Sequence, residues 1–172
     1  MRIGQLRSHD RARLAELLVA TGAFNADEVE VALSLFDHSQ RSAAAGPEAI
    51  PDDYEFVGAF DAERLVGYAC FGPTPATDGT YDLYWLAVHP AAQGRGTGRA
   101  LVRDVEEKLI VRGGRLLVVE TSSRPDYEGT RQFYVRSGYT EAARVRDFYA
   151  PADDRILLTT RLTTRDGGVA TR

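Results

Sequence analysis

Apolar residues recur along the chain with two spacings, one typical of helices and one typical of strands. A spacing of three or four positions places apolar side chains on one face of a helix. It predicts helices over residues 11–20, 29–36, 97–112 and 127–136. Short apolar or alternating runs bounded by turn residues predict strands. These runs cover residues 2–6, 54–60, 64–71, 81–88, 115–120, 139–149 and 155–162.

Local signals mark where several of these elements begin and end. Asn25 followed by Glu28 forms a capping box before the second helix. Gly113 and Gly114 end the third helix. Residues 39–53, rich in Ser, Ala, Gly and Pro, predict a loose surface connection. Residues 163–172 are expected to form a flexible tail.

The order of the elements predicts one α+β domain over residues 1–162. A buried strand, a glycine-rich loop, a helix and another buried strand follow one another between residues 81 and 120. Such an order requires a parallel, right-handed crossover, whereas the shorter connections elsewhere favour antiparallel pairs. A mixed sheet is therefore expected.

Composition narrows the class of protein further. The chain has 172 residues, a formal net charge of −4, and only one cysteine, Cys70. The charge gives no general attraction to nucleic acid or to anionic membranes. A single cysteine excludes an intrachain disulfide, and neither a secretory signal nor a membrane-spanning run is found, so a cytoplasmic location is expected. The three histidines are far apart, so no metal site is expected.

A glycine-rich loop stands between the strand at 81–88 and the helix at 97–112. Alternating glycines let a backbone approach a ligand closely, and the free N–H groups of a helix N-terminus attract an anion. Two arginines add positive charge to the loop and its helix. The pattern predicts a site for a pyrophosphate on Gln93, Gly94, Arg95, Gly96, Thr97, Gly98 and Arg99.

The loop can be compared with the known motifs for nucleotides and for dinucleotides. A nucleotide P-loop needs Gly-Lys followed by Ser or Thr, which is missing. A dinucleotide fingerprint needs a third glycine where Arg99 stands, although Glu120 ends the next strand, where an acid would bind ribose. A tight turn that binds nothing remains the alternative.

The loop resembles the hallmark of the GNAT superfamily of N-acetyltransferases, which is Gln or Arg, two variable residues, Gly, one variable residue, and Gly or Ala. Residues 93–98 match it at every defined position. The block from Arg131 to Tyr139, with Phe133, Tyr134 and Gly138, is similar to a later helix of that family. The two motifs span residues 81–139, and the order of elements extends the likeness over nearly the whole chain.

This resemblance implies a GNAT-like, three-layer fold and a co-substrate. The sheet would be mostly antiparallel, with about six or seven strands and about four helices, and splayed between its fourth and fifth strands. Acetyl-CoA would bind with its pyrophosphate on residues 93–99 and its pantetheine arm along Leu86, Ala87 and Val88. The implied reaction is direct attack of a primary amine, on a small molecule or a protein, on the thioester.

Proton transfer in that reaction requires an acid and a base. Tyr134 matches the tyrosine that protonates the leaving thiolate in the family. Two carboxylates are candidates for the base. Asp82 shares a strand face with Leu86 and Val88. Glu120 ends an apolar strand, where a buried acid would have a raised pKa.

The chain departs from the family pattern in the residues after the fifth strand, which line the coenzyme site in the family. Many members carry an asparagine after the fifth strand, where this chain has Thr121, Ser122 and Ser123. A hydroxyl such as that of Ser122 can take the same role, and Tyr127 and Arg131 are further candidates for contacts with coenzyme or substrate. A sensor that binds acyl-CoA without turnover is the alternative function, which retention of Tyr134 disfavours. Homodimers are common in the family.

Overall fold

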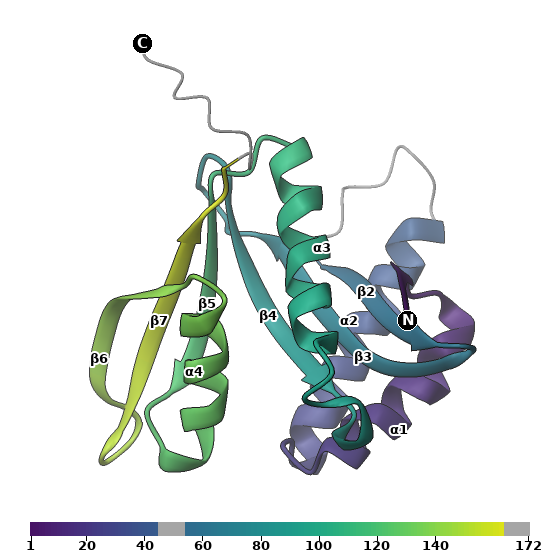
Figure 1. Cartoon of the computed structure of the whole chain (residues 1–172), viewed down its shortest axis with the longest axis horizontal. Coiled ribbons are helices and arrows are strands. Elements are labelled where there is room, and N and C mark those ends of the chain that lie inside the picture. The colour runs from purple at the N-terminus through teal and green to yellow at the C-terminus, as the bar shows by residue number, and fades with distance from the viewer. Residues whose placement is uncertain (45–53, 164–172) are drawn as a thin grey trace. The chain divides into compact units, whose positions relative to one another are not determined.

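The computed structural model describes residues 1–44 and 54–163 (Figure 1). In these ranges the helices are α1 (Arg11–Thr21), α2 (Ala26–Ala44), α3 (Thr97–Val111) and α4 (Glu128–Arg136), with short 3-10 turns η1 (Ser8–Asp10), η2 (Pro90–Ala92) and η3 (Pro125–Tyr127). The strands are β1 (Arg2–Gln5), β2 (Glu55–Asp61), β3 (Arg64–Pro73), β4 (Thr80–Val88), β5 (Leu116–Ser122), β6 (Thr140–Ala150) and β7 (Asp153–Arg161).

The strands form one sheet in the order β1-β2-β3-β4-β5-β7-β6. β2 pairs antiparallel with β1 and β3, and β7 pairs antiparallel with β5 and β6. The predicted fold class, an α+β fold on a mixed and mostly antiparallel sheet with four helices, is confirmed.

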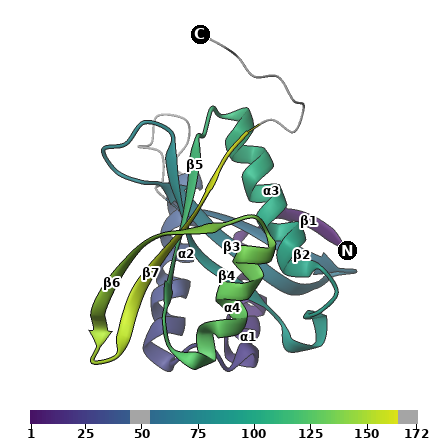
Figure 2. The ribbon, with the colours of Figure 1, turned by 60° about the vertical axis from the view of Figure 1, so that its left-hand side comes forward.

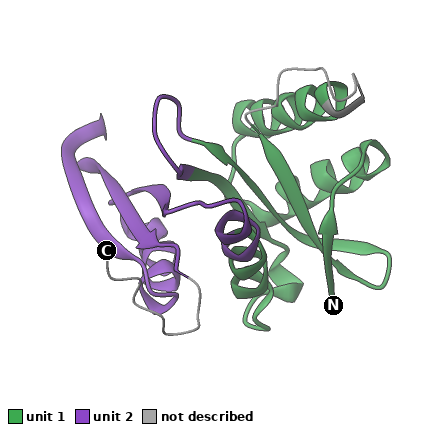
Figure 3. Cartoon of the chain, turned by 90° about the horizontal axis from the view of Figure 1, so that it is seen from above, with its two compact units in different colours: residues 1–73, 82–105 green, residues 74–81, 106–172 purple. Residues whose placement is uncertain are grey.

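The chain divides into two compact units, coloured separately in Figure 3. Unit 1 comprises residues 1–73 and 82–105, and unit 2 comprises residues 74–81 and 106–172. The boundary falls within β4 and within α3, so neither unit is a simple stretch of sequence.

Unit 1 places helices on both faces of its strands (Figure 2). Its main core joins α1 and α2 to β2 and β3 through buried apolar side chains, among them Leu14, Phe36, Phe56 and Tyr68. On the other face the first turns of α3 lie very close to Gly67 of β3, where an added Cβ would come within 3.1 Å of the Leu101 side chain. This close packing fixes the N-terminus of α3, and with it the glycine loop, on the sheet.

Unit 2 is built on β5, β7 and β6, with α4 lying against one face of the strands (Figures 1 and 2). Along β5, Leu117 and Val119 are buried, while their neighbours Leu116 and Val118 are only half-buried. Because successive side chains of a strand point to opposite faces, one face of this sheet is covered and the other is open. Every residue of β6 is exposed.

Several details differ from the sequence-based expectation. α2 continues to Ala44, so residues 39–44 of the predicted loose connection are helical. Tertiary contacts explain the extension: Ser39 is buried, and the Gln40 side chain bonds the hydroxyl of Ser8 and the carbonyl of Leu6. The remaining residues 45–53, and nearly all of the predicted tail, lie outside the described ranges.

The capping box at the start of α2 is confirmed. The Asn25 N–H donates to Glu28 Oε2 at 2.8 Å, and the Glu28 N–H donates to Asn25 Oδ1 at 2.9 Å. Two N–H groups that the helix leaves without partners are thereby satisfied by side chains.

Candidate active site

The glycine loop connects the end of β4, through η2, to the first turn of α3. Gly94 and Gly96 have φ angles of +71° and +81°, in the left-handed region that favours glycine. A Cβ added at either position would meet no atom within 4 Å, so the space beside the backbone is open. The loop can therefore bring backbone N–H groups close to a ligand, and a pyrophosphate fits the described residues.

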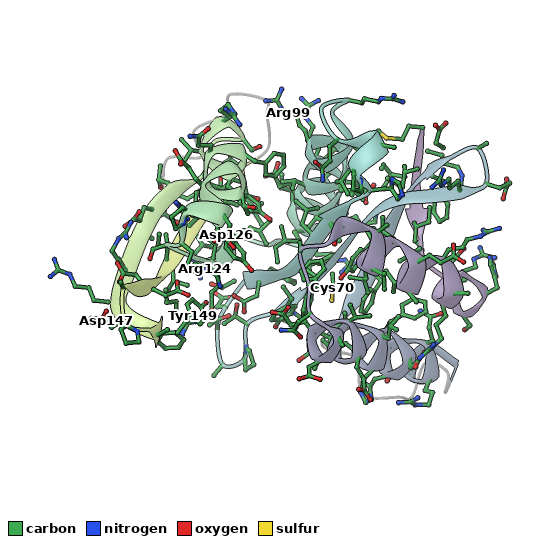
Figure 4. The ribbon with its side chains drawn as sticks, turned by 90° about the horizontal axis from the view of Figure 1, so that it is seen from below. Cys70, Arg99, Arg124, Asp126, Asp147 and Tyr149 are labelled. Carbon is green, nitrogen blue, oxygen red and sulfur yellow. The ribbon has the colours of Figure 1, made fainter. Side chains whose placement is uncertain are left out.

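Side-chain hydrogen bonds within unit 1 hold this loop in place. The buried Thr97 hydroxyl donates to the carbonyl of Ala92 at 3.0 Å. The Gln93 amide donates to the carbonyl of Val88, the last residue of β4, at 3.1 Å. Gln93 therefore ties the loop to the strand, while the side chains of Arg95 and Arg99 are exposed. Arg99 is labelled in Figure 4.

The predicted pantetheine-binding residues lie immediately before the loop, at the end of β4. Ala87 is buried, and Leu86 and Val88 are half-buried. Asp82, one of the two candidate bases, stands half-buried near the start of the same strand. Residues 86–88 therefore adjoin the glycine loop, whereas Asp82 lies near the other end of β4; all belong to unit 1.

Tyr134 lies in unit 2, on α4, with its side chain only 4% exposed. Its ring packs against the rings of Phe133 and Tyr139 at centroid distances of 5.1 and 5.3 Å. Burial raises the pKa of Tyr134 well above its ordinary value. A neutral phenol is suited to donate a proton.

Glu120 is not the buried acid that the sequence predicted, because its side chain is 41% exposed. The alternation of β5 explains the error: Val119 and Thr121 point to the covered face, so Glu120 points to the open one. There its carboxylate accepts a hydrogen bond from the Tyr149 hydroxyl and pairs with the Arg155 guanidinium. Tyr149 lies in the hairpin of β6 and β7 (Figure 4).

Ser122 and Arg131 shape the turn that follows β5. The Ser122 hydroxyl donates to the buried Asp153 carboxylate and accepts from the Arg124 N–H. Arg131 of α4 reaches back to the turn, where its Nη1 donates to the carbonyls of Ser122 at 2.7 Å and Arg124 at 2.9 Å. Both predicted cofactor-binding side chains thus have protein partners, and Tyr127 is half-buried where α4 begins.

Sequence reasoning missed Tyr149, Arg155 and Asp153 as neighbours of the candidate residues. Their contacts arise from the pairing of β7 with β5 and from an irregular stretch of β6, where Asp147 has a φ of +53°. No local pattern marks these contacts, because they join residues about 30 positions apart.

The described residues contain no cluster of three or more His, Cys, Asp or Glu side chains that would hold a metal ion. Cys70, the single cysteine, is buried and not in a disulfide (Figure 4). Within the same ranges, no helix combines the length and apolar character needed to cross a membrane.

Comparison with known protein families gives a match to the acetyltransferase (GNAT) family over residues 18–139. The matched range contains the glycine loop, both candidate bases and Tyr134. It covers most of the chain.

The individual relatives are also acetyltransferases. An N-alpha-acetyltransferase RimI of Mycobacterium tuberculosis is 32% identical over 150 residues, which cover 86% of this chain and 83% of the relative. A solved structure from Desulfovibrio desulfuricans, assigned to the GNAT family of acetyltransferases, is 39% identical with a TM-score of 0.87 and covers 94% of this chain and 99% of its own. The ribosomal-protein-S18-alanine N-acetyltransferase of Escherichia coli shares the fold, with 19% identity, a TM-score of 0.70, and coverage of 99% and 98%.

Proposed function

Because this chain belongs to the acetyltransferase (GNAT) family, we propose that it transfers an acetyl group from acetyl-CoA to a primary amine. The amine attacks the thioester directly while both substrates are bound. The observation that carries this proposal is the open, positive-φ glycine loop at the N-terminus of α3, which suits the pyrophosphate of a coenzyme.

The coenzyme is a substrate of this reaction and supplies the activated acetyl group. In our proposal, the N–H groups of residues 94–98 hold its pyrophosphate, with Arg95 and Arg99 adding positive charge. The backbone of residues 86–88 pairs with the pantetheine arm. Tyr134 donates its proton to the departing thiolate, and its burial keeps the phenol neutral.

Of the two candidate bases, we propose Glu120. Its carboxylate lies on the open face of the unit 2 sheet, and α4, which carries Tyr134, lies on the other face. Tyr149 and Arg155 hold the carboxylate in place, so it can take a proton directly or through a water.

The acceptor that we propose first is the α-amino group of a peptide or protein. The supporting observation is the 32% identity to a relative that acts as an N-alpha-acetyltransferase, over most of both chains. Small primary amines are the second class to test.

A coenzyme-release assay with a panel of acceptors tests the function. The panel contains peptides with free and blocked N-termini, a lysine-containing peptide with a blocked N-terminus, and small amines. We expect free thiol to appear only with an acceptor, and most rapidly with a free peptide N-terminus. Binding of acetyl-CoA without thiol release for any acceptor would instead indicate a sensor.

The base is tested with Glu120→Gln and Asp82→Asn, compared under the same conditions. We expect Glu120→Gln to lower kcat by about 10²-fold or more, because general-base catalysis is typically worth that much. Asp82→Asn should have a much smaller effect. The reverse order of the two effects would transfer the role to Asp82.

A further inference from the structure

His89 stands between the end of β4 and η2, and both nitrogens of its ring face N–H donors. The ring Nδ1 accepts a hydrogen bond from the Ala91 N–H at 3.2 Å, which caps η2. The ring Nε2 lies 3.3 Å from Nη2 of Arg64, the first residue of β3. The backbone N–H of His89 donates to the carbonyl of Val66 on β3, so the two strands are joined at this point.

The two side-chain contacts of the His89 ring cannot both be hydrogen bonds. A neutral imidazole has one nitrogen that donates and one that accepts, and a protonated imidazole has two that donate. Because Nδ1 accepts from Ala91, the ring proton is on Nε2, where it faces the Arg64 guanidinium. A guanidinium only donates. The fold therefore brings two N–H donors together, one of them charged, and neither can accept from the other.

An anion would satisfy both donors, because its oxygens accept from the imidazole and from the guanidinium together. The donors of an arginine match the oxygens of a phosphate, and charge makes such hydrogen bonds stronger than neutral ones. Arg64 is exposed and His89 is half-buried, so a ligand can reach the pair. The chain just before Arg64 carries two carboxylates, Asp61 and Glu63, yet the guanidinium lies against the imidazole.

This pair of donors lies close to the glycine loop, and both belong to unit 1. Only the three residues of η2 separate His89 from Gln93, where the loop begins. The exposed side chains of Arg95 and Arg99 add positive charge to the same region. A ligand with several phosphate groups is attracted to such a surface and can contact it at more than one place.

We propose that Arg64 and His89 form a second anion site of unit 1, separate from the pyrophosphate loop, which binds a phosphate monoester or a phosphate ion. The guanidinium and the imidazole Nε2–H donate to its oxygens. This chemistry has two sources, the 3′-phosphate of coenzyme A and free phosphate. For the first source the proposal rests on the function proposed above, and the site selects coenzyme A over the form that lacks the 3′-phosphate. For the second source it is independent of that function.

Calorimetric titration with coenzyme A and with 3′-dephospho-coenzyme A tests the first source. At one ionic strength, the wild type should bind coenzyme A about tenfold or more tightly, as fits charge-assisted hydrogen bonds to the 3′-phosphate. Arg64→Met removes the guanidinium, and His89→Asn removes the Nε2–H while its amide oxygen can still cap η2. Each variant should reduce this ratio of affinities to about threefold or less. Each should keep the Kd of 3′-dephospho-coenzyme A within about twofold, because the pyrophosphate loop is intact.

Arg41→Met provides the matched control. Arg41 is an exposed arginine of α2, and its substitution removes the same charge from unit 1. The control should leave the ratio of the two affinities at its wild-type value, because long-range attraction to an exposed charge is screened by salt. An equal reduction of the ratio in Arg41→Met and Arg64→Met would show an effect of net charge and contradict a contact with the 3′-phosphate.

Titration with inorganic phosphate, followed by NMR through the ring signals of His89, tests the second source. Phosphate should shift these signals in the wild type and not in Arg64→Met. Such a shift, with equal affinities of the wild type for the two coenzymes, would assign the site to free phosphate. If Arg64 and His89 affect neither the ratio of affinities nor the response to phosphate, the proposal is overturned. If the wild type binds neither coenzyme, the proposed function fails, and the phosphate titration alone decides whether the site exists.

Discussion

Buried hydroxyl groups in this chain divide into those with protein partners and those without. The Tyr139 hydroxyl donates to Glu106 at 3.0 Å, and Ser122 donates to Asp153. Tyr68 and Thr121 are also buried, yet their hydroxyls find no partner in the described residues. A buried hydroxyl without a partner reduces stability, whereas one with a partner does not. Ser122 and Tyr139 therefore contribute to the fold, while the unpartnered hydroxyls do not.

Tyr68→Phe tests this view in unit 1. The Tyr68 ring is fully buried in the core, and burial raises the pKa of its hydroxyl. Removing the unpaired hydroxyl should raise the free energy of unfolding by about 1 kcal/mol. Urea unfolding measures the change. A loss of stability would show that the hydroxyl has a partner, such as an ordered water.

At the scale of elements, the glycine loop and the helix that follows it could be predicted closely from sequence. The signals there are local: alternating glycines and apolar positions at helical spacing. The start of α2 was predicted in the same way, from the capping box at Asn25 and Glu28. The environment of Glu120 could not be predicted, because it depends on the pairing of β5 with β7 and on the irregular path of β6. Side chains from Tyr149 and Arg155 reach Glu120 only once that sheet has formed.

The loop itself is tested with Gly96→Ala and a matched control, Gly113→Ala. Both glycines have φ near +80°, at +81° and +79°, and neither Cβ would meet an atom within 4 Å. Each variant should therefore lose about 1 kcal/mol of stability from backbone strain alone. Only Gly96→Ala should weaken acetyl-CoA binding, by about tenfold or more, because its methyl group occupies the space beside the phosphate-binding backbone.

If these two variants bind acetyl-CoA with equal affinity, the glycine loop does not bind the pyrophosphate. Equal losses of stability, measured by thermal unfolding, would at the same time show that the backbone strain is matched.

For the whole molecule, the order of elements and the hydrophobic pattern were sufficient to predict the mixed sheet with helices on it. Strand order and register depend on contacts between distant residues, which the pattern of a single strand does not specify. The division into two compact units, with its boundary inside β4 and α3, likewise has no signal in the sequence.

Buried tyrosines in both units predict how the stability of the whole chain depends on pH. Burial raises the pKa of Tyr68, Tyr134 and Tyr139 in the folded protein. Their contribution is complete below the unfolded tyrosine pKa of about 10, and it is lost as pH rises above that value, because the unfolded chain ionises first. Urea unfolding between about pH 8 and about pH 11 should show a steep loss of stability, and Tyr139→Phe should reduce the slope. If the substitution leaves the slope unaltered, Tyr139 does not contribute to the pH dependence of stability.

Tyr134→Phe tests the central claim, that this chain is an acetyltransferase whose acid lies on α4. Phenylalanine keeps the ring packing against Phe133 and Tyr139 and removes only the proton donor. With the best acceptor of the panel, kcat should fall by about 10²-fold or more, while the Kd of acetyl-CoA stays within about twofold. A variant that turns over at the rate of the wild type would contradict the account.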